Sequence, residues 1–319
     1  LKLERVGQRD TKVVPLDIEE ATQALYKAHQ KVLLDYYHDN KAFYLDWIRR
    51  HRKMGKEPLM GSGIWTWNKY WYDWRFTEAK AGACVDACVE AKVKEVFFTM
   101  WGDNGAYCDH DSAFAGMLFC AEKSYGHTNP SKRVLVDKFS AVCGGSYAAH
   151  ILAGNIHGGI ADFQPKMWED PLFETYFRTF CKDKPARMAR IAQGFAALAT
   201  ALQEVRNDRA IGDLDYAYRT ALAFARRYAF SARLLAAYRA KDRAALRRLR
   251  RDIPPVIRAI RDMDTAFRRM WLAHNKPQGI ETIQGRFGML EARYREIGER
   301  QGQQAPRIGG DPLQVRRQD

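Results

Sequence analysis

The stretch that decides the fold is Glu95-Val96-Phe97-Phe98-Thr99-Met100-Trp101-Gly102-Asp103-Asn104-Gly105. Its first half is apolar, β-branched and aromatic, which predicts a buried strand, and its second half is a turn-forming sequence. In parallel α/β folds the carboxyl ends of strands carry ligand-binding loops. A tryptophan ring beside a carboxylate suits a sugar, whose C–H face stacks on the ring while its hydroxyls donate to the carboxylate. A core tryptophan followed by an ordinary turn is the alternative.

Two similar patterns precede this stretch. Each begins with a short apolar strand that ends in polar or aromatic residues, and a helical pattern follows each of the three strands. Strands are expected at 31–34, 64–67 and 93–100, and the helices at 41–54, 76–91 and 112–125. Repeats of about 30 residues predict parallel strands whose carboxyl ends lie at one rim. A further helix is expected over 18–30, with its start at Val14-Pro15-Leu16-Asp17.

The character of the chain changes at Gly126-His127-Thr128-Asn129-Pro130-Ser131. A loop-rich connector is expected next, and the chain is then helical almost to a loose tail. The helical patterns cover 186–207, 213–241, a segment interrupted at Pro254-Pro255 that resumes to Asn275, and 281–301. The predicted fold class is therefore α/β followed by all-α. Residues 1–130 form the α/β domain and residues 131–319 form the α-helical domain.

The net charge of +14 on 319 residues is unevenly distributed. From Ala186 onward there are 27 Lys and Arg against 14 Asp and Glu, whereas the first 185 residues carry 25 against 24. The arginines alternate with Ala, Leu and Tyr along helices, which favours a solvated helical face over a nucleic-acid surface. Zinc-finger spacing and single-strand-binding motifs are not found, so no nucleic-acid partner is expected. No apolar run approaches 18 residues, so no membrane partner is expected either.

The six cysteines are expected to be buried thiols of a reducing compartment, which predicts a cytoplasmic protein. Their spacing fits neither a zinc site nor a disulfide framework. Cys108, Asp109, His110 and Asp111 are capable of binding metal, but four adjacent side chains do not easily converge on one ion. No metal and no other cofactor are therefore expected.

Three motifs in order resemble the last three barrel strands of glycoside hydrolase family 20, the exo-acting β-N-acetylhexosaminidases. They are Asp35-Tyr36-Tyr37, Gly63-Ile64-Trp65-Thr66-Trp67 and Thr99–Ala106. Two later segments, Trp168–Leu172 and Asn275–Glu281, resemble the helical domain that follows the barrel in a bacterial branch of this family. The resemblance spans roughly residues 14–301. It implies that residues 1–130 are the C-terminal strand–helix units of a (β/α)8 TIM barrel.

The resemblance also implies roles in binding a terminal N-acetylhexosaminide. Trp101 would form the floor under the sugar, and Asp103 would accept hydrogen bonds from its O4 and O6 hydroxyls. The family more often has Glu at the latter position. Trp65 or Trp67 would wall the pocket, and Asp35 would be the carboxylate of the family's Tyr-x-Asp motif.

Two positions depart from the family pattern. The tyrosine of Tyr-x-Asp falls at Leu33, which has no hydroxyl to hold the substrate's acetamide, so Tyr36 or Tyr37 is a candidate substitute. Tyr107 replaces an acidic residue expected after Gly105-Ala106. These departures leave open whether N-acetylglucosamine or N-acetylgalactosamine is preferred.

The family's catalytic pair is an adjacent Asp-Glu, in which Glu protonates the leaving oxygen and Asp orients the 2-acetamido group that attacks the anomeric carbon. This sequence has no His-x-Gly-Gly-Asp-Glu segment, and His157-Gly158-Gly159 is read as a loop. We therefore expect no catalytic residue in this chain and place the pair upstream of Leu1. A non-catalytic glycan-binding or structural module is the alternative. Homodimer formation is left open.

Overall fold

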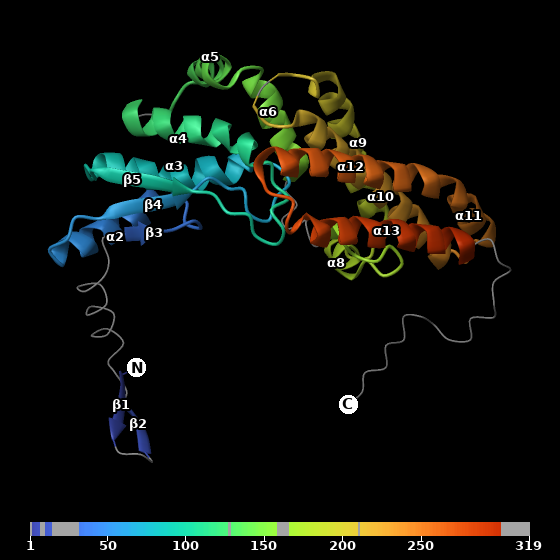
Figure 1. Ribbon diagram of the computed structural model, residues 1–319, viewed down its shortest axis with the longest axis horizontal. Coiled ribbons are helices and arrows are strands. Elements are labelled where there is room, and N and C mark those ends of the chain that lie inside the picture. The colour runs from blue at the N-terminus through green and yellow to red at the C-terminus, as the bar shows by residue number, and fades with distance from the viewer. Residues whose placement is uncertain are drawn as a thin grey trace. The chain divides into compact units, whose positions relative to one another are not determined.

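The computed structural model describes residues 2–6, 10–14, 32–126, 129–157, 166–209 and 211–300 (Figure 1). Contacts divide the chain into two compact units, and each is described by itself. The sheet unit comprises residues 1–65, 74–100 and 116–135, and the helical unit comprises 66–73, 101–115 and 136–319. Segments 66–73 and 101–115, which follow the second and third strands of the parallel sheet, thus belong to the helical unit.

The sheet unit contains a hairpin and a parallel sheet. Strands β1 (Lys2–Val6) and β2 (Asp10–Val14) pair antiparallel, in a stretch for which no strand had been expected. The helix predicted over 18–30 lies outside the described residues. Strands β3 (Val32–Leu34), β4 (Leu59–Gly63) and β5 (Glu95–Thr99) pair in parallel in the order β3-β4-β5. The predicted parallel strands are confirmed, whereas a barrel stays a prediction.

The second strand was placed too late in the sequence. The aromatic run at 64–67 predicted a strand, but β4 ends at Gly63. Burial rather than β-pairing explains the run, because Ile64, Trp65 and Trp67 are each at most 7% exposed. Hydrophobicity alone does not separate a buried loop from a buried strand in so short a segment.

Helices α2 (Lys41–Lys53) and α3 (Trp74–Glu90) follow β3 and β4. The side chain of Asn40 caps α2 by accepting a hydrogen bond from Ala42 N, and basic residues fill its last turn, where they complement the helix dipole. A 3₁₀ turn, η1 (His110–Ala113), and helix α4 (Phe114–Gly126) follow β5. These helices begin within a few residues of the predicted positions.

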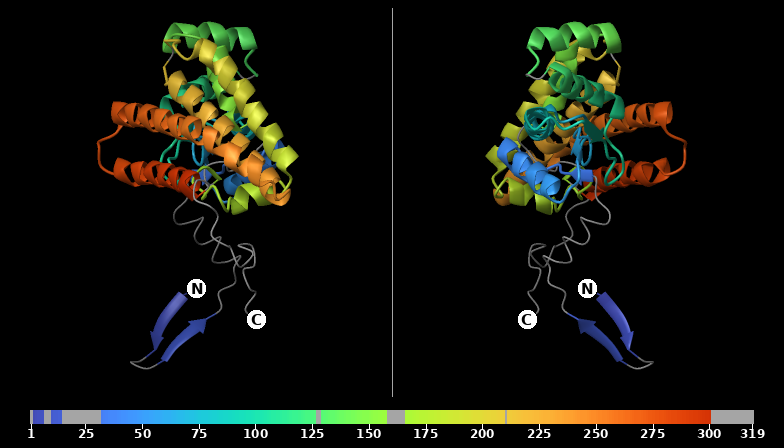
Figure 2. Two further views of the ribbon diagram at one scale, coloured as in Figure 1. Left: turned by 90° about the vertical axis from the view of Figure 1, so that its right-hand side faces the viewer. Right: turned by 90° about the vertical axis from the view of Figure 1, so that its left-hand side faces the viewer.

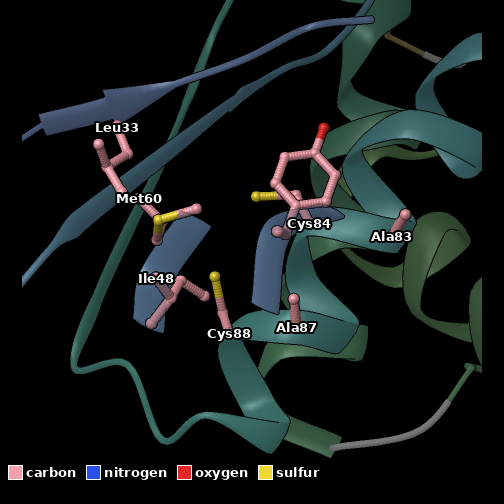
Figure 3. Packing of buried hydrophobic residues seen from close by; sticks show 8 residues of the cluster. Leu33, Ile48, Met60, Ala83, Cys84, Ala87 and Cys88 are labelled. Atoms are coloured by element: carbon pink, nitrogen blue, oxygen red, sulfur yellow. The ribbon is translucent and has the colours of Figure 1, made fainter. Parts of the chain in front are cut away.

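One face of the sheet packs against α2 and α3 (Figure 3). The paired residues Leu33, Met60 and Val96 contribute the sheet side of this core. The helices contribute the remaining buried members, which are Tyr44, Ile48, Ala83, Cys84, Ala87 and Cys88. Small residues on α3 let the helix approach the sheet closely. Five of the six cysteines of the chain are buried, as expected.

The next paired row, Leu34, Gly61 and Phe97, lies on the opposite face, because successive side chains alternate along a strand. Leu34 is 38% exposed there. Strand β5 was expected to be buried, yet its residues are exposed or half-buried. The reason is its position at one edge of the described sheet, where it has a strand neighbour on one side only.

We predict that Gly61→Ala destabilises the sheet unit. A Cβ at this position would lie 2.6 Å from both Leu34 Cδ1 and Phe97 Cζ, so a neighbour must move. We expect the free energy of unfolding, measured by urea denaturation, to fall by about 1–3 kcal/mol. Gly194→Ala is the control, because nothing lies within 4 Å of its Cβ on an exposed helix position, and it should stabilise by up to about 1 kcal/mol. Stabilisation by both substitutions would contradict the packing described.

The helical unit is built on four long helices, α9 (Pro185–Val205), α10 (Leu214–Arg239), α12 (Ile253–His274) and α13 (Ile280–Arg300). Helix α10 packs against α9 and α12, and α12 packs against α13. Figures 1 and 2 show α12 in orange and α13 in red side by side, joined by a short turn. Such short connections make neighbouring helices antiparallel.

Two expectations for this part need correction. The segment expected to be loop-rich is largely helical, with α5 (Lys132–Cys143), α6 (Tyr147–Ala153), η2 (Gly154–His157) and α8 (Thr175–Phe180). Pro254 and Pro255 do not interrupt a helix. They occupy the first turn of α12, where no backbone N–H is needed, and α11 (Arg243–Arg248) and η3 (Leu249–Asp252) precede them. Within the described residues, every helix is too short or too polar to cross a lipid bilayer.

Most arginines of the helical unit were expected to point outward, but Arg227 on α10 is fully buried. Its Nη2 lies 3.3 Å from Glu174 Oε1 and donates to the carbonyl of Glu169 at 2.7 Å. Ser231 Oγ also donates to Glu174 Oε1, at 2.7 Å. Burial raises the pKa of Glu174 to about 7, against the attraction of Arg227 and the hydrogen bond from Ser231.

This burial predicts a pH-dependent stability. The ordinary pKa of the Glu174 carboxyl is 4.5, so the unfolded chain loses this proton first as the pH rises. The folded state then binds more protons, and the free energy of unfolding should fall by about 1–3 kcal/mol between pH 4.5 and 7. Glu174→Gln keeps an acceptor without a titrating group, so its urea-denaturation profile should be flatter over this range. Parallel profiles for the two proteins would refute this assignment.

Candidate functional site

The six predicted site residues divide between the two units. Asp35, Tyr36 and Trp65 belong to the sheet unit, and Trp67, Trp101 and Asp103 belong to the helical unit. Each group is therefore described on its own. A shared concavity of all six stays a prediction.

Asp35 organises the turn that follows β3. Its carboxylate accepts from the backbone N–H groups of Tyr37 at 2.8 Å and His38 at 3.0 Å, from the Tyr44 hydroxyl at 2.9 Å, and contacts His38 Nδ1 at 2.7 Å. Partial burial opposes ionisation, but the hydrogen bonds from His38, Tyr44 and Tyr37 together lower the pKa of Asp35. The carboxylate is thus held charged. Its partners within the protein already use both oxygens, so a sugar would have to share them.

Tyrosines at the end of β3 lie near the end of β5. Tyr36 accepts a hydrogen bond from Thr99 Oγ1 at 2.9 Å. Tyr37 is 64% exposed and stands edge-on against Trp65, with ring centroids 5.5 Å apart. Trp65 itself is only 7% exposed. Because Leu33 points into the core, the exposed hydroxyl-bearing ring at this rim is Tyr37, which the sequence offered only as a substitute for the tyrosine expected at Leu33.

The loop after β5 has an unusual backbone. Asn104, Gly105 and Ala106 all have positive φ angles, of 62°, 126° and 49°. Such conformations cost energy for residues with a Cβ and persist where the surroundings enforce them. A Cβ on Gly105 would lie 2.8 Å from Ile283 Cδ1 of α13 and 2.9 Å from the ring of Tyr107, so helix α13 fits closely against the loop.

Hydrogen bonds within the helical unit fix both ends of this loop. Thr66 Oγ1 donates to Trp101 O at 2.9 Å and accepts from Trp101 N at 3.1 Å. Asn104 Nδ2 donates to Asn68 Oδ1, and Arg286 Nη1 donates to Asn104 O at 3.4 Å. The two strand-end loops are thereby linked to each other and to α13.

The fixed loop presents Trp101 and Asp103 to solvent. Trp101 is 47% exposed, Asp103 is exposed, and no hydrogen bond or ion pair engages the Asp103 carboxylate within the described residues. An accessible ring therefore lies two residues from an accessible anion. Trp67 is only 4% exposed, so a direct sugar contact by this residue, like one by Trp65, stays a prediction.

Tyr107, a departure from the family pattern, has a structural role. Its ring is buried, its hydroxyl accepts a hydrogen bond from Arg286, and its carbonyl accepts from the Tyr216 hydroxyl at 2.7 Å. Burial raises the pKa of Tyr107 against the effect of Arg286, so the phenol stays protonated. Sequence reasoning missed Thr66 and Arg286, because their roles depend on contacts between segments far apart in the chain.

The carboxylates downstream of Cys108 also hold the loop. Asp109 accepts from the backbone N–H groups of Asp213 at 2.5 Å and Asp111 at 3.0 Å, and burial raises its pKa to about 6. Asp111 Oδ2 lies 3.0 Å from His274 Nε2 at the end of α12. Asp109, Asp111 and His274 each offer a ligand atom within 4.8 Å of the others. The carboxylate oxygens of Asp109 accept hydrogen bonds from backbone N–H groups, and Asp111 contacts His274. These contacts connect the loop to α10 and α12.

His157 belongs to the packed interior. It ends η2, and burial lowers its pKa well below the ordinary value, so the ring is neutral. Its Nε2 lies 3.0 Å from the carbonyl and 3.3 Å from the backbone nitrogen of Trp71. Gly158 and Gly159, which follow it, lie outside the described residues. His157 thus has a structural role in a 3₁₀ turn and not in the loop expected there, and the loop expected at Gly158 and Gly159 stays a prediction.

The packed helices α9, α10, α12 and α13 make the C-terminal part of the chain an all-α domain. Residues 164–303 match the family model described as Glycoside Hydrolase 20C C-terminal domain. Residues 164–303 are thus similar to the C-terminal helical domain of glycoside hydrolase family 20, and the resemblance read from the motifs of this part is confirmed. No curated protein matches the chain.

We predict that Arg286→Ala loosens the loop that carries Trp101 and Asp103. The substitution removes the donors to Asn104 O and the Tyr107 hydroxyl, so amide hydrogen exchange over residues 102–107 should accelerate about tenfold, equivalent to about 1.4 kcal/mol of local stability. Arg295→Ala, which removes an exposed partner of Glu291 on the same helix, is the control. Equal acceleration in both variants would show that the loop does not depend on Arg286.

Proposed function

We propose that this chain is part of an exo-acting β-N-acetylhexosaminidase. In this proposal the complete enzyme removes terminal β-linked N-acetylglucosamine or N-acetylgalactosamine by substrate-assisted, retaining hydrolysis. The described residues supply walls of the sugar pocket. The match of residues 164–303 to the helical domain of family 20 supports a hexosaminidase-related glycoside hydrolase. The substrate and the sugar-binding role of this chain are what we propose beyond that match.

The observation that carries the proposal is the rigid display of Trp101 and Asp103. The loop after β5 is anchored to Thr66 and α13, yet the indole and the carboxylate at its tip remain accessible. A site that binds a ligand through stacking and hydrogen bonding benefits when its groups are held before the ligand arrives. We assign the indole to the apolar face of the sugar and the carboxylate to its O4 and O6 hydroxyls.

No residue of the described chain is assigned to the bond-breaking step. Stacking and hydrogen bonds to remote hydroxyls position the ring, but they neither protonate the glycosidic oxygen nor orient the acetamide. General acid catalysis alone is typically worth about 10²–10⁴-fold, so binding residues cannot replace it. We place the acid and the orienting aspartate in a segment that this sequence does not include.

A non-catalytic glycan-binding or structural module is the second candidate. The observation that favours it is the absence of an adjacent Asp-Glu pair anywhere in the 319-residue sequence. The two candidates share the sugar contacts and differ in turnover. They are distinguished by testing the chain alone and the chain extended by the residues that precede it in its gene.

We predict that residues 1–319 bind methyl N-acetyl-β-glucosaminide but do not hydrolyse an aryl N-acetyl-β-glucosaminide at a useful rate. Titration calorimetry should show that Asp103→Ala weakens binding by about 30-fold, or about 2 kcal/mol, since a hydrogen bond to a charged group is lost. Trp101→Ala should weaken it at least tenfold.

Tyr125→Ala is the control for these variants, because Tyr125 is an 87% exposed aromatic of the sheet unit with no assigned role. Unchanged affinity in Asp103→Ala would remove that residue from the site. Robust turnover by residues 1–319 would mean that the catalytic groups have been misplaced. Binding by the extended protein without turnover would favour the non-catalytic module.

A further inference from the structure

The largest concentration of positive charge in the helical unit lies where α10 ends and α12 begins. Residues 239–251 contain seven basic residues and one acidic residue. Five of the basic side chains are exposed and form no ion pair within the described residues. These five, called the basic patch here, are Lys241, Arg243, Arg247, Arg250 and Arg251.

The basic patch differs from the arginines on neighbouring helix faces. Many of those arginines pair with acids on the next helix, as in Arg219–Asp262 at 2.9 Å and Arg261–Glu291 at 2.7 Å, whereas the unpaired cations of the basic patch are concentrated in one segment. In α11, by contrast, Leu249 and the half-buried Leu246 face inward, while Arg243 and Arg247 stand one turn apart on the outside. Unpaired like charges at this spacing repel one another, so a bound polyanion would stabilise this end of the unit.

Helix α12 separates the basic patch from the proposed sugar loop. Its first residue, Ile253, follows η3 directly, and its last residue, His274, contacts Asp111 in the loop segment. A helix of 22 residues is about 33 Å long. Figure 1 shows α11 at one end of α12 and the turn into α13 at the other. A ligand that engaged both places would have to be an extended polymer.

We propose that the basic patch is a docking surface for an acidic polysaccharide. This inference rests on the proposed function, since it takes the partner to be the charged remainder of a glycan whose terminal sugar is the substrate. The residues themselves favour a partner recognised by charge alone. Between 239 and 252 there is no Asn or Gln to read a base edge, and Tyr238, the 44% exposed aromatic just before this range, offers a single ring rather than a series of stacking platforms. Nucleic acid is therefore the less favoured partner and becomes an outcome of the test.

The test is fluorescence anisotropy of labelled heparin, a sulfated glycan, titrated with the chain at 50–200 mM salt. Four released counterions predict an affinity loss of about 100-fold over this salt range. In the variant Arg243→Gln/Arg247→Gln/Arg250→Gln/Arg251→Gln, affinity at 50 mM salt should fall at least tenfold and the salt dependence should become shallow. Because all four side chains are exposed, the circular dichroism spectrum should not change.

The matched control removes four other exposed arginines for which no ion pair is found within the described residues: Arg190→Gln/Arg209→Gln/Arg226→Gln/Arg268→Gln. It changes the net charge equally, so an equal loss in both variants would reduce the effect to overall charge and overturn the proposal. Tighter binding of a DNA duplex of matched charge than of heparin would overturn the choice of partner. Binding of the neutral methyl N-acetyl-β-glucosaminide should be the same in both variants. If the unmutated chain did not bind methyl N-acetyl-β-glucosaminide, the proposed sugar site would be contradicted, whereas the proposal for the basic patch would not.

Discussion

The hydrogen bond from the backbone N–H of Asp213 to the buried carboxylate of Asp109 is the contact on which the helical unit's functional arrangement depends. It joins the segment 101–115 to the start of α10, and Asp213 in turn caps α10 by accepting from Tyr216 N at 2.9 Å. The Tyr216 hydroxyl donates a hydrogen bond to the carbonyl of Tyr107, within the same loop segment. One helix start thus fixes the loop at two points. A surface loop with strained residues would otherwise sample many conformations.

This arrangement gives the helical domain a physical role beyond stability. The strand-end segments 66–73 and 101–115 group with the helices, and contacts from α10, α12 and α13 fix the second of them. Loops at the carboxyl ends of parallel strands are free to vary because the strands do not specify their shape. In this chain the required shape comes from helices that lie more than 100 residues downstream.

The sequence predicted what depends on local pattern and missed what depends on distant partners. Strands β3 and β5 and the four long helices were expected within a few residues, because periodicity and capping are local properties. The strand at 64–67 was wrong because a buried loop has the same apolar composition as a strand. Arg227 could not be recognised as buried, since its partner Glu174 lies on another element. Asp103 was predicted as a site residue from a motif, which stays a prediction, whereas Arg286, which holds its loop, has no sequence motif.

The turn after β3 shows why transferring a family motif residue by residue has limits. Asp35 matches the family carboxylate, yet three neighbours already donate to it, and Leu33 fills the core where the motif has a tyrosine. A buried aliphatic side chain at this position stabilises the sheet through packing on α2 and α3. A tyrosine there would need room for a larger ring and a partner for its hydroxyl. Tyr37 is not subject to these two requirements, because its ring is exposed at the rim, where it stands against Trp65. The lack of a hydroxyl at position 33 and the presence of one in the adjoining turn are therefore compatible with a rim that keeps an exposed phenol.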